Sequence, residues 1–161
     1  MKKNFIILLL IALIPIKAFA LIEVDITRGN LNPLPSAVSP LSIDDKSKKS
    51  FEKILKKENI GSEISTIVEN NLRTSGLFNP LSKDAFLQAP DIANLKPRFE
   101  DWNLIKAQAL ITGKVTYVDE KLRVEFRLWD VLAAKEMMAL AFTTVPSNWR
   151  RVGHIISDKV Y

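Results

Sequence analysis

The stretch ALITGKVTYVDEKLRVEFRLWDV, residues 109–131, alternates apolar and polar side chains in two runs, and it constrains the fold more than any other feature. Alternation with a period of two is typical of strands that bury one face. That face carries Ala109, Ile111, Gly113, Val115 and Tyr117 in the first run and Leu122, Val124, Phe126 and Leu128 in the second. The residues DEK between the runs predict a hairpin. A third run, EMMALAFTT, predicts a three-stranded antiparallel meander whose apolar face needs a cover.

Two segments have the helical spacing that such a cover requires. In residues 62–78, apolar residues recur at the i, i+3, i+4 and i+8 positions of one helix face. Ser62 is expected to cap the start of this helix, and Gly76 is expected to adopt a left-handed conformation just after its end. The second segment follows Pro146 and Ser147. It places Trp149, Val152, Ile156 and Val160 on one side of a terminal helix. Helices packed on one face of the meander make a two-layer α/β sandwich.

The rest of the chain predicts less regular structure. PSAVSPL, residues 35–41, reads as a short strand. Residues 42–63 are strongly charged, and Phe51, Ile54 and Leu55 indicate only one or two amphipathic turns within a solvated stretch. Residues 79–108 contain three prolines and predict an extended connection, with a short helix starting near Asp101.

The first twenty residues have the organisation of a secretory signal peptide. A basic head, MKK, precedes an apolar run, and Ala18 and Ala20 supply the small residues of a cleavage site after Ala20. The apolar run is shorter than the roughly 20 residues that span a bilayer, which weighs against the alternative of an uncleaved membrane anchor. A bacterial-type signal of this kind leads to the periplasm, so we expect that compartment. Cleavage would leave residues 21–161.

Cleavage also changes the charge of the chain. Loss of Lys2, Lys3 and Lys17 lowers the count of Lys and Arg from 23 to 20 against 18 Asp and Glu, so the net charge falls from +5 to +2. A nearly balanced mature chain gives no electrostatic argument for binding nucleic acid. The motif NWRR is aromatic and basic, but Trp149 falls on the apolar helix face, where core packing is the better interpretation.

The sequence offers little for catalysis. It has no cysteine, and His154 is the only histidine, which leaves a general base without an obvious nucleophile and a zinc site without enough ligands. Glu100 and Asp101 are adjacent acids best explained by a helix N-terminus. We therefore expect no enzyme activity, no cofactor and no metal. Three classes of protein remain open: an exported binding module for an unrelated partner, a nucleic-acid-binding module, and a hydrolase-like envelope enzyme.

Several motifs, in order and spacing, resemble the TolB amino-terminal domain family of the Tol–Pal cell-envelope system. These are NPLP, LRTSGLFNPL, PRFEDWNLIKAQALITGKV, LRVEFRLWDV and FTTVPSNWRRVGHIISDKVY. The resemblance covers nearly all of the chain after the signal and is weakest over Ser42–Glu63. It implies a mixed, mostly antiparallel sheet of about five strands packed by two main helices. It assigns residues 42–161 to this α/β domain and residues 21–41 to an N-terminal segment with short strands.

The resemblance also implies a function. It describes a non-enzymatic periplasmic adaptor that supports outer-membrane integrity, constriction at cell division and colicin-type protein import. The mature N-terminus would bind the C-terminal domain of TolA. The matching residues are Leu21, Ile22, Glu23, Val24, Asp25, Ile26, Thr27, Arg28, Gly29 and Asn30. Pal would bind a β-propeller that follows this domain in the family, and the chain reaches Tyr161 where the linker to that propeller would start. We therefore expect a truncated protein.

Overall fold

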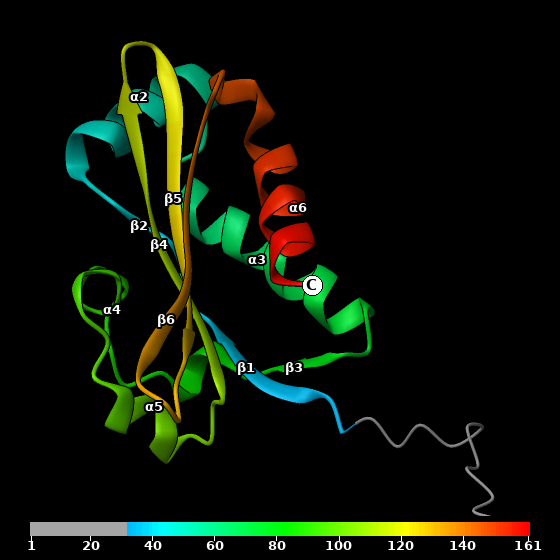
Figure 1. Cartoon of the computed structure of the whole chain (residues 1–161). Helices are drawn as coiled ribbons and strands as arrows, with labels where there is room; N and C mark the ends of the chain where they lie inside the picture. The colour runs from blue at the N-terminus through cyan, green and yellow to red at the C-terminus, as the bar shows by residue number, and fades with distance from the viewer. Residues whose placement is uncertain (1–31) are drawn as a thin grey trace, which may run out of the picture. The chain divides into compact units, whose positions relative to one another are not determined.

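The computed structural model describes residues 32–161, and these form a mixed sheet with helices on both faces (Figure 1). The strands are β1 (Leu34–Val38), β2 (Ser42–Ile43), β3 (Phe78–Pro80), β4 (Ala109–Val118), β5 (Lys121–Asp130) and β6 (Lys135–Thr144). The helices are α2 (Asp45–Leu55), α3 (Ile60–Thr74), α4 (Pro90–Leu95), α5 (Phe99–Leu104) and α6 (Trp149–Val160), with short 3₁₀ turns η1 (Lys83–Ala85) and η2 (Pro146–Asn148). The α/β fold class is confirmed.

The sheet has six strands, in the order β3-β1-β4-β5-β6, and β2 also pairs with β4. The ladders β4–β5 and β5–β6 are antiparallel, whereas β1 pairs in parallel with both β3 and β4. The predicted meander is therefore confirmed, and β1 lies inside the sheet. The turn between β4 and β5 is two residues, Asp119 and Glu120, with φ of 50° and 58°. Two left-handed residues give the turn the twist that a tight hairpin needs.

The predicted apolar face of the meander forms the main hydrophobic core of the domain. α3 and α6 lie together on that face of the sheet (Figure 1). The fully buried side chains include Val115, Leu122, Val124 and Phe126 from the strands and Ile64, Leu72 and Ile156 from the helices. The two helices expected to cover the meander thus do so. Gly76 has φ +72° just after α3, as predicted.

Two expectations about the helices are wrong. The charged stretch contains a continuous 11-residue helix, α2, and not one or two turns. Lys and Glu are good helix formers, and the Asp44 side chain caps the start by accepting from the Ser47 backbone N–H. In addition, Ser62 is not a cap, because α3 begins two residues earlier, at Ile60, after an Asn59 that makes no side-chain capping bond.

A second apolar cluster lies apart from the main core. It contains Ala37, Ala93, Trp102, Ala107, Leu110 and Val131. Leu110 belongs to the β4 residues that alternate with the predicted core face, so both faces of β4 are buried along this part of its length. α4 and α5 supply Ala93 and Trp102 to this cluster. The connection between β3 and β4 is therefore more structured than predicted, and its short helix begins at Phe99, close to the expected position.

Candidate functional site

The predicted partner-binding segment, Leu21–Asn30, lies outside the described residues, as do Ala18 and Ala20. The structure does describe where the chain that follows this segment is anchored. The Leu34 N–H donates to the Leu77 carbonyl at 2.8 Å, and the Gln108 N–H donates to the Pro35 carbonyl at 2.8 Å. β1 is therefore held between β3 and β4 from its first residues onward.

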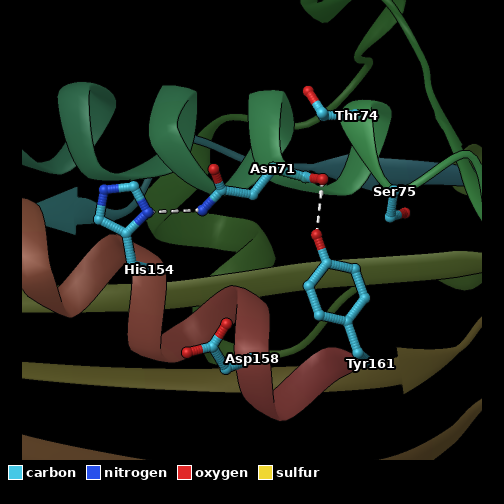
Figure 2. A pocket seen from close by; sticks show the side chains of 6 residues that line it. All are labelled: Asn71, Thr74, Ser75, His154, Asp158 and Tyr161. Carbon is cyan, nitrogen blue, oxygen red and sulfur yellow. Dashed lines mark hydrogen bonds between the residues drawn. The ribbon is translucent and has the colours of Figure 1, made fainter.

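A surface hollow of about 470 Å³ lies between the ends of α3 and α6 (Figure 2). Its lining residues are Asn71, Thr74, Ser75, His154, Asp158 and Tyr161. The Asn71 side-chain amide donates to His154 Nδ1 at 2.9 Å and to Ser157 Oγ at 3.0 Å. The Tyr161 hydroxyl donates to the Asn71 carbonyl. The polar groups of this hollow therefore join the two helices to each other.

These bonds limit what the hollow can do chemically. Nδ1 of His154 accepts a hydrogen bond from an amide, so in the neutral ring the proton lies on Nε2. Asn71 cannot serve as an orienting acid in the way that a carboxylate orients a catalytic histidine. His154 is exposed, and its ring lies at the contact between α6 and α3.

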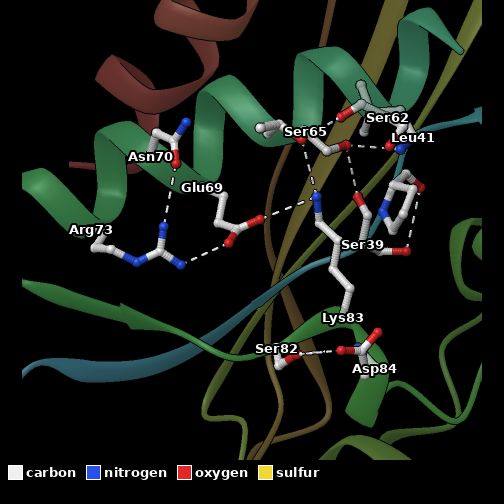
Figure 3. Close-up of polar contacts among 12 residues, drawn as sticks. Ser39, Leu41, Ser62, Ser65, Glu69, Asn70, Arg73, Ser82, Lys83 and Asp84 are labelled. Atoms are coloured by element: carbon white, nitrogen blue, oxygen red, sulfur yellow. Dashed lines mark hydrogen bonds and ion pairs between the residues drawn. The ribbon is translucent and has the colours of Figure 1, made fainter.

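A second group of polar contacts fastens α3 to the segments beside it (Figure 3). The Leu41 N–H donates to Ser65 Oγ at 2.9 Å, and this hydroxyl lies 3.0 Å from the carbonyl oxygens of both Ser39 and Gly61. Ser65 is only 1% exposed. A buried hydroxyl with this many partners is fully satisfied and holds the β1–β2 connection against the helix.

Glu69 lies at the centre of an ion-pair group on α3 (Figure 3). Its carboxylate is 2.7 Å from Arg73 Nη2 and 3.1 Å from Lys83 Nζ. Partial burial opposes ionisation, but the hydrogen bonds from Arg73 and Lys83 outweigh it and hold the pKa of Glu69 below its ordinary value. Lys83 belongs to η1, so the group links α3 to the connection after β3.

The other two carboxylates with a shifted pKa also stabilise local structure through hydrogen bonds. The Ser47 backbone N–H lowers the pKa of Asp44, which caps α2. Hydrogen bonds from Gln88 and Arg98 lower the pKa of Asp101. Within residues 32–161, no group of three or more His, Cys, Asp or Glu side chains is placed to hold a metal ion. No helix in that range is long and apolar enough to cross a membrane.

The three tryptophans are structural, as predicted for Trp149. Trp149 is 6% exposed in the main core, and the Arg150 guanidinium lies over its ring at 4.6 Å from the centroid. Trp102 is 1% exposed, and Trp129 Nε1 donates to Thr112 Oγ1 at 2.9 Å. NWRR is therefore not an aromatic platform. The fold and its contacts define a small α/β domain whose polar side chains mainly fasten helices to the sheet.

Comparison with known proteins identifies the particular family. Residues 22–137 match the sequence model of the TolB amino-terminal domain. The Tol-Pal system protein TolB of Pelagibacter ubique (strain HTCC1062) is 85% identical over 153 residues. The match covers 95% of this chain and 34% of that relative, so the chain spans about a third of its length. The chain belongs to the TolB amino-terminal domain family.

Solved structures agree on the fold. The crystal structure of TolB from Acinetobacter baumannii superposes with a TM-score of 0.62 at 22% identity, covering 80% of this chain and 27% of that one. A dodecamer of a PelC variant from Paraburkholderia phytofirmans gives a TM-score of 0.50 at 17% identity, covering 78% of this chain and 86% of that one. At these identities the likeness concerns the fold alone.

Proposed function

We propose that this chain is a non-enzymatic adaptor of the Tol–Pal system in the periplasm. The observation that carries this proposal is the 85% identity to a Tol-Pal system protein TolB over 95% of the chain. The described polar groups support it, since His154 and the shifted carboxylates are occupied in holding helices and turns. The role would be to support outer-membrane integrity, constriction at division and colicin-type import.

Export is the first step of this proposal. The signal peptide would be removed after Ala20, and the periplasmic protein would begin at Leu21. N-terminal sequencing of the protein released from the periplasm would give LIEVD if this is right. A product that keeps Met1 and remains in the inner membrane would contradict the proposed processing.

The segment Leu21–Asn30 would bind the C-terminal domain of TolA. Ile22, Val24 and Ile26 alternate with Glu23, Asp25 and Thr27, and this pattern suits the addition of a strand to the edge of a partner sheet. In strand addition the backbone hydrogen bonds supply affinity and the alternate side chains supply specificity. The six strands described for the domain all lie after this segment, between Leu34 and Thr144.

Pal would bind elsewhere. In the family resemblance Pal docks on the β-propeller, whereas residues 22–137 of this chain match the amino-terminal domain. We therefore propose a division of labour, in which this domain engages TolA while Pal engages the β-propeller of a full-length TolB.

The experiment that tests the proposal is a pair of calorimetric titrations. The C-terminal domain of TolA and, separately, Pal are titrated into the mature chain and into a variant that lacks residues 21–27. We expect TolA binding only with the segment present and no Pal binding to either protein. Circular dichroism should show that the deletion leaves the fold intact. Equal TolA affinity for both proteins would reject the role of the segment, and tight Pal binding would reject the division of labour.

A further inference from the structure

The two edges of the sheet differ in a way that bears on binding. At one edge, β3 has only three residues and ends in Pro80. Short strands and prolines are devices that prevent unwanted pairing at an edge. At the other edge, β6 has ten residues, no proline, and no charged side chain after Glu136. The outer backbone groups of β6 make no hydrogen bond to any other element of residues 32–161.

The core face of β6 is also less covered than that of its neighbour. Met138, Leu140 and Phe142 pair with the β5 residues that carry the main core. Leu140 is 38% exposed, whereas its partner Phe126 is fully buried. α6 contacts β5 more extensively than β6, so the helix layer thins out toward this edge (Figure 1).

A groove of about 350 Å³ lies between β6 and α6. The strand side is formed by residues 141–144, and the opposite side includes Asn148 of η2 and Arg151 and Ile155 of α6. Arg151 is the one charged residue in this lining, and it forms no ion pair with any residue of the described range. The groove therefore combines an unpaired strand edge, apolar side chains and a single cation.

We propose that the β6 edge binds an extended polypeptide with apolar residues at alternate positions. At the alternate position after the last apolar residue, this polypeptide carries a carboxylate. The peptide backbone pairs with the outer side of β6. Its apolar side chains continue the row formed by Met138, Leu140 and Phe142, and its carboxylate lies against Arg151. This combination of strand pairing, alternate pockets and one charge is the general chemistry of strand addition.

The charge of the groove favours a single strand that carries an acid as the occupant. A second copy that paired through its own β6 would place its α6 layer on the same side of the joined sheet as this α6. Such a pairing would add a second Arg151 and no acid, since the groove lining contains no carboxylate, so both cations would stay unmatched. A lone extended segment brings no helix, and the charge of Arg151 selects one that carries an acid.

The test uses a synthetic peptide that is blocked at both ends and in which valines alternate with threonines. A glutamate stands where the next valine of this alternation would be. A second peptide replaces that glutamate with glutamine, and a third carries the same residues with the valines adjacent. Binding of the labelled peptides to the full chain is measured by fluorescence polarisation. We expect the glutamate peptide to bind, the glutamine peptide to bind about threefold more weakly, and the third peptide not to bind.

Two protein variants locate the site. In Arg151→Gln, the preference for glutamate over glutamine should disappear. Leu140→Lys places a charge inside the edge and should abolish binding, whereas Leu132→Lys, at an exposed loop leucine outside the groove, should bind as the wild type does. Circular dichroism of each variant verifies that it is folded.

Three results would overturn the proposal. The first is no binding of the glutamate peptide at millimolar concentration. The second is equal binding to the Leu140→Lys and Leu132→Lys variants. The third is a wild-type dimer in sedimentation that Leu140→Lys dissociates, which would assign the edge to a second copy of the chain. TolA binding does not enter any of these measurements, so their failure leaves the adaptor proposal to its own test.

Discussion

Asn71 on α3 and His154 on α6 are joined directly, since the Asn71 amide donates to His154 Nδ1 at 2.9 Å (Figure 2). The same amide also donates to Ser157 Oγ at 3.0 Å, one turn further along α6. One half-buried side chain thus ties together the two helices that cover the sheet.

Removing this amide should weaken the helix pair. We expect Asn71→Ala to lower the free energy of unfolding by about 1–2 kcal/mol, because both hydrogen bonds are lost and Ser157, which is fully buried, loses an interhelical donor. Urea denaturation measures the change. The neighbouring Asn70→Ala is the matched control and should cost less than about 0.5 kcal/mol, since Asn70 is exposed and its side chain accepts only a 3.3 Å bond from Arg73. Equal effects of the two changes would contradict this role of Asn71.

Two glycines near the ends of α3 should respond differently to alanine. At Gly76 the φ of +72° is strained for alanine, although no atom lies within 4 Å of the added methyl, so Gly76→Ala should cost about 1 kcal/mol. At Gly61 the methyl would collide with the Leu41 carbonyl oxygen, beside the bond from the Leu41 N–H to Ser65. Gly61→Ala should therefore cost more. Denaturation midpoints with unchanged slopes test the order, and a larger loss at Gly76 would refute it.

Trp149 is expected to be the most sensitive position of α6. It is 6% exposed and packs in the core with Val152 and Ile156, so Trp149→Ala should cost about 3–5 kcal/mol. Trp149→Phe keeps part of the buried area and should cost less. Thermal denaturation followed by circular dichroism measures both. A folded Trp149→Ala protein of unchanged stability that had lost only partner binding would show that the residue is a ligand platform instead.

The stability of the domain should depend on the ionisation of Glu69. Its pKa is lower in the folded chain than the ordinary value of 4.5, so the native state favours the carboxylate. The resulting stabilisation is complete above the unfolded-state pKa and is lost as the pH falls through the folded-state pKa. Urea titrations from about pH 6 to pH 3 should therefore show a shallower acid loss for Glu69→Gln than for the wild type. The control Glu58→Gln, at an exposed position, should follow the wild-type curve. If the ion pairs of Glu69 contributed nothing to stability, Glu69→Gln would follow that curve as well.

The sequence predicted those helices and strands in which the apolar residues follow a strong periodic pattern. Strands β4 to β6 follow from alternation, and α6 follows from the spacing of Trp149, Val152 and Ile156. The left-handed conformation of Gly76 follows from a helix pattern that stops directly before it. In each case burial on one face fixes the side chains, and burial is the signal that a sequence carries best.

The missed features depend on contacts between distant segments. α2 buries only Ser47 and Phe51, so its apolar pattern is weak, although Asp44 with Ser47 is a capping signal that could have located its start. The cluster around Trp102 draws single residues from several short elements, and no periodicity connects them. Parallel pairing of β1 with β3 rests on three residue pairs, too few to leave a pattern. The partner-binding segment stays a prediction, since it lies outside the described residues.

The most direct test of the account is the affinity of the TolA C-terminal domain for two variants of the segment, measured by calorimetry. Strand addition depends on the backbone, so Glu23→Ala, which removes a side chain alone, should keep the wild-type affinity within about threefold. Val24→Pro removes a backbone donor and should weaken binding by at least about tenfold. We predict this order of affinities, with the fold of both variants unchanged. Wild-type affinity for Val24→Pro would contradict it.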